Sequence, residues 1–201
     1  MSAEHRPNIA ICGAGISGLT LAAILSRALK GSSAKVTVYE RAAPDRDQGY
    51  GLDLNEHGQE ALARAGVYHR YWEISREQSD KMCFMHPSKF EPLAVSYTPR
   101  WLVDLFPGLG GTKYAARPES NREKLRDVLL EALAGNGNAD VHFNTPVLDI
   151  HEHPDELGSR AEVRLNTGTR SLLVRSVVVV HAHNRCPLAR SQDLFRALFV
   201  F

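Results

Sequence analysis

The chain has 201 residues, of which 43% are hydrophobic and 23% charged, and its 24 basic side chains nearly balance 23 acidic ones. This composition is typical of a globular protein with one domain, or one domain and part of another. The near-neutral balance gives no electrostatic footprint for nucleic acid. No apolar run approaches the roughly 18 residues of a membrane span, and the N-terminus lacks the apolar stretch of a signal peptide. We therefore expect a cytoplasmic protein with no nucleic-acid partner and no membrane span.

The first elements form a strand, a glycine-rich turn, a helix and a second strand. The apolar residues Asn8–Cys12 predict a strand, residues 16–30 predict a helix, and Lys35–Tyr39 predict the next strand. Between the first two lies the sequence Gly13-Ala14-Gly15-Ile16-Ser17-Gly18. This spacing is typical of a dinucleotide-binding turn, in which the free N–H groups that open the helix face a diphosphate.

Each glycine of the turn has a separate mechanical role. Gly13 permits the tight turn, Gly15 allows the backbone to approach a diphosphate, and Gly18 allows the helix to pack closely on the sheet. Glu40 follows the second strand, where a carboxylate can accept from both ribose hydroxyls and disfavour a 2′-phosphate. The alternative is a βαβ unit whose glycine turn is coincidental.

The residues around this turn resemble a known family. The sequence 18–25, with Ala22 four residues after the last glycine, and Glu40-Arg41 at the end of the second strand are similar to the opening of FAD-dependent aromatic-ring monooxygenases of the p-hydroxybenzoate and salicylate hydroxylase type. These are the group A flavoprotein monooxygenases. The resemblance implies an α/β fold, with a Rossmann-like FAD/NAD(P)-binding domain of the glutathione-reductase type and part of a β-rich substrate domain. It also implies that FAD is the cofactor and that Arg41 lies in the nucleotide region.

A second glycine-bearing stretch follows a polar loop at residues 42–48. Residues 48–54 include Gly49 and Gly51, and Asn55 is a plausible N-cap for a helix that ends at Gly66. In the family a similar stretch lies against the flavin nucleotide, so the resemblance assigns Gly49 and Gly51 to the approach to the ring. From the residues alone, a turn and a surface helix explain the pattern equally well.

Residues 79–98 change to short apolar runs broken by prolines, with strands expected at residues 82–85 and 93–95. In the family such strands form the floor of the substrate pocket. The aromatic residues of this region can line a pocket for an aromatic substrate, although core packing is the commoner role for each: Phe84, Tyr97, Trp101, Phe106 and Tyr114. Residues 108–113 lack the order of a Walker motif and are expected to form a flexible turn.

A capping box at Ser120 and Glu123 predicts a helix with an apolar face formed by Leu125, Val128, Leu129 and Leu133. Arg122 lies in its first turn, where a cation opposes the helix dipole. The residues alone favour a solvated or Glu123-paired side chain for Arg122, and an anionic ligand is the alternative. The resemblance implies that Arg122 contacts FAD.

Further strands are expected at residues 139–143 and 146–150, returning to the nucleotide domain, and then at residues 161–165, 172–174 and 177–180. The resemblance then stops, because the sequence has His181-Ala182-His183-Asn184 where the family has Gly-Ala-Asp-Gly. We therefore expect a truncated or altered C-terminal half. The expected organisation is an FAD-binding part at residues 1–75, substrate-domain strands at 76–118, a return to the FAD-binding domain at 119–183 and a divergent tail at 184–201. We expect the apolar residues 194–201 either to cover a sheet edge or to drive association.

Metal and nucleophilic chemistry have little support. Cys12, Cys83 and Cys186 show no metal-ligand spacing and are expected to be reduced thiols. The pairs His151/His153 and His181/His183 each point to one face of a strand, but no third ligand follows from spacing, so no metal is predicted. No catalytic triad can be inferred, so we predict binding residues and no catalytic ones.

The sequence therefore predicts an FAD-dependent monooxygenase by resemblance. NADPH or NADH would reduce the flavin, and O2 would serve to hydroxylate or epoxidise a small aromatic or apolar substrate. Two alternatives stay open, a non-catalytic FAD/ADP-binding fragment and another FAD- or NAD-dependent dehydrogenase. The oligomeric state does not follow from the sequence.

Overall fold

The computed structural model describes residues 8–46, 49, 51–76, 82–89, 91–96, 101, 105, 118–155, 158–165, 171–174 and 176–179. The chain divides into two compact units. The sheet unit comprises Met1–Asp47 and Leu129–Phe201, and the inserted unit comprises Gln48–Val128.

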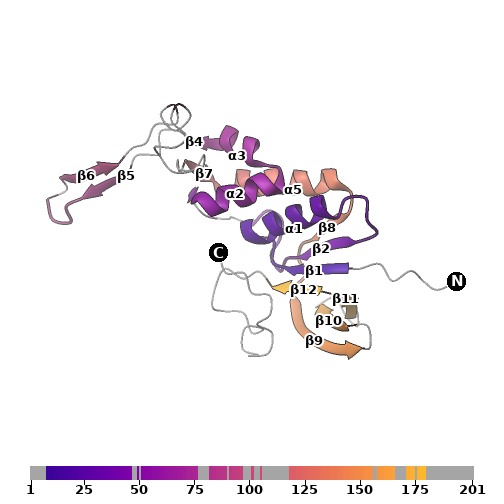
Figure 1. Cartoon of the computed structure of the whole chain (residues 1–201). Coiled ribbons are helices and arrows are strands. Elements are labelled where there is room, and N and C mark those ends of the chain that lie inside the picture. The colour runs from indigo at the N-terminus through magenta and orange to yellow at the C-terminus, as the bar shows by residue number, and fades with distance from the viewer. Residues whose placement is uncertain are drawn as a thin grey trace. The chain divides into compact units, whose positions relative to one another are not determined.

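The sheet unit is built on four parallel strands. These are β1 (Asn8–Cys12), β2 (Lys35–Tyr39), β8 (Ala139–His142) and β12 (Ser176–Val179), in the order β12-β1-β2-β8. Helix α1 (Ile16–Ala28) joins β1 to β2, as Figure 1 shows in indigo. The predicted β1 and β2 are confirmed at both ends, and α1 ends two residues before the predicted bound.

The core of this unit lies between α1 and the sheet. Ile11, Leu19, Val36 and Val38 have no exposed surface. Burial of such side chains contributes about 1.5–3 kcal/mol each, so this layer fixes how α1 meets the strands. The glycine turn between β1 and α1 is therefore held at both of its ends by packed elements.

A second, antiparallel sheet belongs to the same unit. It consists of β9 (Val147–Asp155), β10 (Gly158–Leu165) and β11 (Ser171–Val174), in the order β11-β10-β9. The strand predicted at residues 146–150 is confirmed as the start of β9, which pairs in this antiparallel sheet. Strand β9 extends to Asp155 and meets β10 along its length, a pairing that apolar periodicity does not predict.

The inserted unit contains a small sheet with two short helices. Strands β3 (Gly51–Asp53), β7 (Glu119–Asn121) and β4 (Ser75–Arg76) pair in the order β3-β7-β4. Helix α2 (Glu56–Ala65) has the predicted caps: Asn55 Oδ1 accepts from the Gly58 N–H at 2.9 Å, and Gly66 adopts the left-handed conformation at φ 81°. Helix α3 (Tyr68–Ile74) was not predicted.

Helix α5 (Arg122–Asn136) confirms the predicted apolar face, because Leu125, Val128, Leu129 and Leu133 are buried. The predicted N-cap was wrong by one residue. Asn121 Oδ1 accepts from the Lys124 N–H at 3.0 Å, whereas Ser120 is fully buried in β7. Strand pairing explains the difference, because Ser120 is in register with both Leu52 and Ser75.

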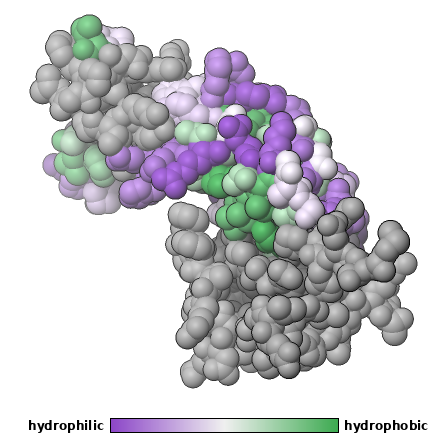
Figure 2. Space-filling model, turned by 45° about the vertical axis from the view of Figure 1, so that its right-hand side comes forward, coloured by the Kyte–Doolittle hydropathy of each residue, from purple (hydrophilic) through white to green (hydrophobic). Residues whose placement is uncertain are grey.

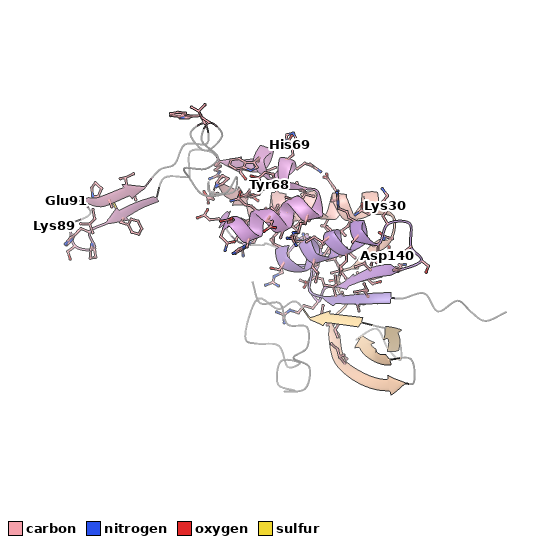
Figure 3. The ribbon with its side chains drawn as sticks, viewed as in Figure 1. Lys30, Tyr68, His69, Lys89, Glu91 and Asp140 are labelled. Atoms are coloured by element: carbon pink, nitrogen blue, oxygen red, sulfur yellow. The ribbon has the colours of Figure 1, made fainter. Side chains whose placement is uncertain are left out.

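Strands β5 (Met82–Met85) and β6 (Pro92–Ser96) confirm the predicted runs and form an antiparallel hairpin. Lys89 and Glu91 lie at its turn (Figure 3). Phe84 is 53% exposed and Trp101 is 64% exposed, so core packing was the wrong interpretation for these two aromatic residues. Tyr97, Phe106 and Tyr114 lie outside the described residues. On the face drawn in Figure 2, hydrophilic residues take up much of the described surface and hydrophobic ones gather in smaller areas.

Several sequence predictions concern residues that the structure does not describe. They include the turn at 108–113, the tail at 184–201, the His181/His183 pair and Cys186. For His151 and His153 the backbone alone is described. Cys83 has an exposed free thiol, and Cys12 is half-buried in β1. Among the described residues, no helix is both long and apolar enough to cross a bilayer.

Candidate dinucleotide-binding site

The glycine turn has the conformation and the crowding that its sequence predicts. Gly13 adopts φ 108°, a region that other residues rarely occupy, and its N–H donates to the Tyr39 carbonyl at 2.8 Å. A Cβ at Gly18 would overlap the Gly13 carbonyl oxygen. Gly18 therefore has to be glycine for α1 to pack at this distance from β1.

The space beside Gly15 is open. Gly15 is the N-cap of α1, with φ −73° and ψ 175°, and a Cβ built on it would have no atom of the described residues within 4 Å. Among the described residues no side chain caps this end of the helix, and Ile16, Ser17 and Gly18 of the first turn bring no acidic group. The first turn of α1 therefore combines a backbone that a ligand can approach with N–H groups that favour an anion.

Glu40 faces the glycine turn from the end of β2. Its Oε2 accepts from the Ala14 N–H at 2.8 Å, and its Oε1 accepts from the Ala42 N–H at 2.8 Å. Its backbone is held by β8 and the loop after it, because the Glu40 N–H donates to the His142 carbonyl and the Thr145 N–H donates to the Glu40 carbonyl, both at 2.8 Å. The carboxylate is thus fixed beside the turn.

Tyr39 and His142 support the strand ends beside Glu40. Tyr39 is 6% exposed, and its ring stacks on that of His142 with centroids 5.6 Å apart. Burial raises the pKa of the Tyr39 phenol above its ordinary value, and the neighbouring Cys12 raises it further. The side chain therefore stays neutral at physiological pH, so it adds no charge next to the Glu40 carboxylate.

The other predicted site residues fall into two groups. Arg41 is exposed at the start of the turn that follows β2. Gly49, Gly51 and Arg122 belong to the inserted unit. Within that unit Gly51 is in register with Asn121, so the structure brings Gly51 close to Arg122, which follows Asn121 in the chain. Gly49 is exposed with φ 79°, and Arg122 is half-buried.

Sequence reasoning missed the backbone partners of Glu40. The Ala42 N–H and the segment from His142 to Thr145 carry no motif of their own. The available signal was the prediction that residues 139–143 form a strand. In a parallel sheet such a strand, next to β2, ends beside Glu40.

Comparison with known proteins decides the family. The model of the FAD binding domain family matches residues 6–180. The chain belongs to this family. Among characterised proteins, 3-amino-4-hydroxybenzoate 2-monooxygenase PtnB3 of Streptomyces platensis is 44% identical over 63 residues, which are 31% of this chain and 15% of that protein.

Solved structures of such proteins have the same fold. The crystal structure of p-nitrophenol 4-monooxygenase PnpA from Pseudomonas putida DLL-E4 matches with a TM-score of 0.67 at 17% identity, over 87% of this chain and 40% of that one. Aklavinone-11 hydroxylase, solved with FAD and aklavinone, matches with a TM-score of 0.65 at 23% identity, over 88% of this chain and 32% of that one. This chain therefore spans less than half the length of either protein.

The residues of the site fit an FAD molecule. The open backbone at Gly15 and the uncapped start of α1 suit a diphosphate, and the Glu40 carboxylate beside Ala14 suits a ribose. The assignment requires open space at Gly15 and a Glu40 carboxylate that faces the turn. Both are present among the described residues.

Proposed function

We propose that this chain binds FAD through its ADP half at the glycine turn. The observation that carries the proposal is the Glu40 carboxylate, which lies beside the Ala14 N–H and next to the open first turn of α1. In this arrangement the diphosphate accepts hydrogen bonds from the first-turn N–H groups, Gly15 leaves room for it, and Gly13 and Gly18 hold the turn's shape. Glu40 accepts from the ribose hydroxyls.

Glu40 has enough acceptor capacity for this role. A carboxylate offers about four lone-pair positions, and two are used by the Ala14 and Ala42 N–H groups. One position on each oxygen is left for a ribose hydroxyl. The negative charge also disfavours a 2′-phosphate, which favours FAD or NAD over NADP at this turn.

We propose that a full-length protein containing this domain is an NADPH- or NADH-dependent monooxygenase, which acts on a small aromatic or apolar substrate. Bound FAD supplies the redox chemistry by which the pyridine nucleotide and O2 are used. In this proposal the chain's own residues bind and orient the cofactor: Arg41 and Arg122 lie along the nucleotide, and Gly49 and Gly51 allow backbone approach to the ring. Residues 1–75 and 119–183 would form the FAD-binding domain, and residues 76–118 part of the substrate domain.

Titration of the purified full chain with FAD and with ADP tests the binding step. We expect both to bind, and Glu40→Ala to weaken ADP binding by about 1–3 kcal/mol. The matched control is Glu60→Ala, which removes an exposed carboxylate paired with Arg64 in α2. No binding of either nucleotide by the folded wild-type chain would refute the proposal.

Oxidation of NADPH or NADH by the FAD-loaded chain separates the enzyme from the binding module. A visible flavin spectrum that bleaches with the reductant and recovers in air supports the monooxygenase. ADP and FAD binding without bleaching supports the non-catalytic FAD/ADP-binding alternative. Arg122→Ala should weaken FAD binding if the assignment of Arg122 to the nucleotide is right.

A further inference from the structure

The Glu40 carboxylate joins two backbone segments by hydrogen bonds that need no ligand. One oxygen accepts from Ala14, in the glycine turn, and the other from Ala42, in the turn after β2. Both N···O distances are 2.8 Å. Charge-assisted bonds of this kind are roughly twice as strong as neutral ones.

Two hydrogen bonds tie the middle of the glycine turn to the end of β2. Ala14 is 3% exposed and lies between Gly13 and Gly15, residues that lose more conformational freedom on ordering than any other. The Gly13 N–H donates to Tyr39, so one backbone bond already ties the turn to β2. The Glu40 carboxylate adds a second tie one residue later, to an N–H group on a buried residue that water does not readily satisfy.

We propose that Glu40 is a positioning residue, which holds the glycine turn in its ligand-ready conformation before a nucleotide binds and keeps both N–H bonds afterwards. The second part rests on the proposed function, because it concerns ADP or FAD at this turn. The first part does not, since it is a property of the free chain. Ordering the turn in advance lowers the conformational cost of binding.

Amide hydrogen exchange of the ligand-free full chain tests the first part. In Glu40→Gln, the amide –NH2 faces one of the two N–H groups, so at least one bond is lost. In Glu40→Asp, the charge remains but the carboxylate lies one methylene closer to the backbone. We expect the Ala14 amide to exchange at least about tenfold faster in both variants.

Reference amides distinguish a local effect from general loosening. Val36, whose N–H donates to the Asn138 carbonyl at 3.0 Å, should exchange at the wild-type rate in both variants. Glu60→Gln, on the exposed side of α2, should leave Ala14 unchanged. An unchanged Ala14 rate in Glu40→Gln, or an equal acceleration at Val36, would overturn the positioning role. A wild-type rate in Glu40→Asp would show that charge alone acts and would overturn it as well.

Exchange in the presence of saturating ADP tests the second part. We expect Ala14 and Ala42 to remain protected in the wild-type complex, with Ala14 slower than in the free chain. Deprotection of Ala14 on ADP binding would overturn the claim that the bond persists. If ADP does not bind but the free variants respond as expected, the proposed function fails and the positioning role stands. If ADP binds and Ala14 exchange is unaffected in Glu40→Gln, the positioning role fails and the proposed function stands.

Discussion

Ser26 and Asn138 form a reciprocal pair of hydrogen bonds between α1 and the turn before β8. The Ser26 hydroxyl donates to Asn138 Oδ1 at 2.5 Å, and Asn138 Nδ2 donates to the Ser26 backbone carbonyl at 3.1 Å. Asn138 also accepts from the Val36 N–H through its own carbonyl. This pair joins the two chain segments of the sheet unit.

Asn138→Ala should destabilise the fold by about 1–3 kcal/mol, because it leaves the Ser26 hydroxyl without this partner at a site with no exposed surface. Urea unfolding of the purified chain measures the loss. Ser32→Ala is the control with a smaller expected loss, since the Ser32 hydroxyl donates to the Leu29 carbonyl at an exposed position and accepts from the Ala34 N–H at 3.2 Å. Equal unfolding midpoints for Asn138→Ala and Ser32→Ala would contradict this prediction.

Gly18→Ala and Gly15→Ala should separate stability from binding. Gly18→Ala forces a methyl group against the Gly13 carbonyl, so we expect the free energy of unfolding to fall by about 1–3 kcal/mol. Nucleotide binding should weaken as well, because the turn is displaced. The new methyl group of Gly15→Ala meets no atom in the described part of the chain, so its unfolding midpoint should stay closer to wild type while its affinity for ADP falls. Thermal melts and ADP titrations of both variants provide the measurements. If Gly15→Ala binds ADP like wild type, the diphosphate does not pass over this residue.

Substitution of Gly51 can distinguish a packing role for this residue from contact with the cofactor. A Cβ there would overlap the Glu119 side chain, whose carboxylate end can rotate aside, so Gly51→Ala should destabilise the inserted unit by no more than about 1 kcal/mol. Adding Glu119→Ala should restore most of that loss, because the ion pair of Glu119 with Arg76 is 3.9 Å long and largely exposed. A double variant as unstable as Gly51→Ala would show that the clash lies elsewhere. FAD affinity of the rescued double variant then reports whether Gly51 also contacts the cofactor.

Tyr39 should make stability fall at high pH. Burial raises the pKa of the folded-state phenol above the ordinary 10.0, with added contributions from Cys12 and Asp140. Below pH 10 both states are protonated and the phenol causes no pH dependence. Above pH 10 the unfolded chain releases this proton first, which lowers the free energy of the unfolded state. The free energy of unfolding therefore declines until the pH passes the folded-state pKa. Urea unfolding between pH 8 and about 11 should show a steeper decline for wild type than for Tyr39→Phe. Parallel profiles would contradict this assignment.

Local signals made much of the fold predictable. Asn8–Cys12 and Lys35–Tyr39 are short apolar runs beside punctuating glycines or turns, and α2 has caps at both ends. Helix α3 was missed because Val67 provides no side-chain cap and the helix is short and rich in aromatic residues. Its stability depends on the buried Tyr71, whose hydroxyl donates to the Pro118 carbonyl at 3.0 Å.

The candidate site was predictable where one segment contains it. The glycine turn and Glu40 follow from a single βαβ unit, and the structure places them in hydrogen-bond contact. The pairing of Gly51 with Asn121 depends on residues far apart in the chain, so neither periodicity nor a motif indicates it. The same reason explains why the cap of α5 is Asn121 rather than Ser120.

The position of the inserted unit has a consequence for synthesis in the cell. β2 is complete at Tyr39, but its neighbour β8 begins only at Ala139. At translation rates of about 5–20 residues per second, the outer edge of β2 waits on the order of 5 to 20 s for its partner. During that interval its backbone N–H and C=O groups are open to pairing with another chain. Ribosome-bound chains halted before Ala139 should therefore be cleaved by protease within β2, and chains that include the finished β8 should resist cleavage there.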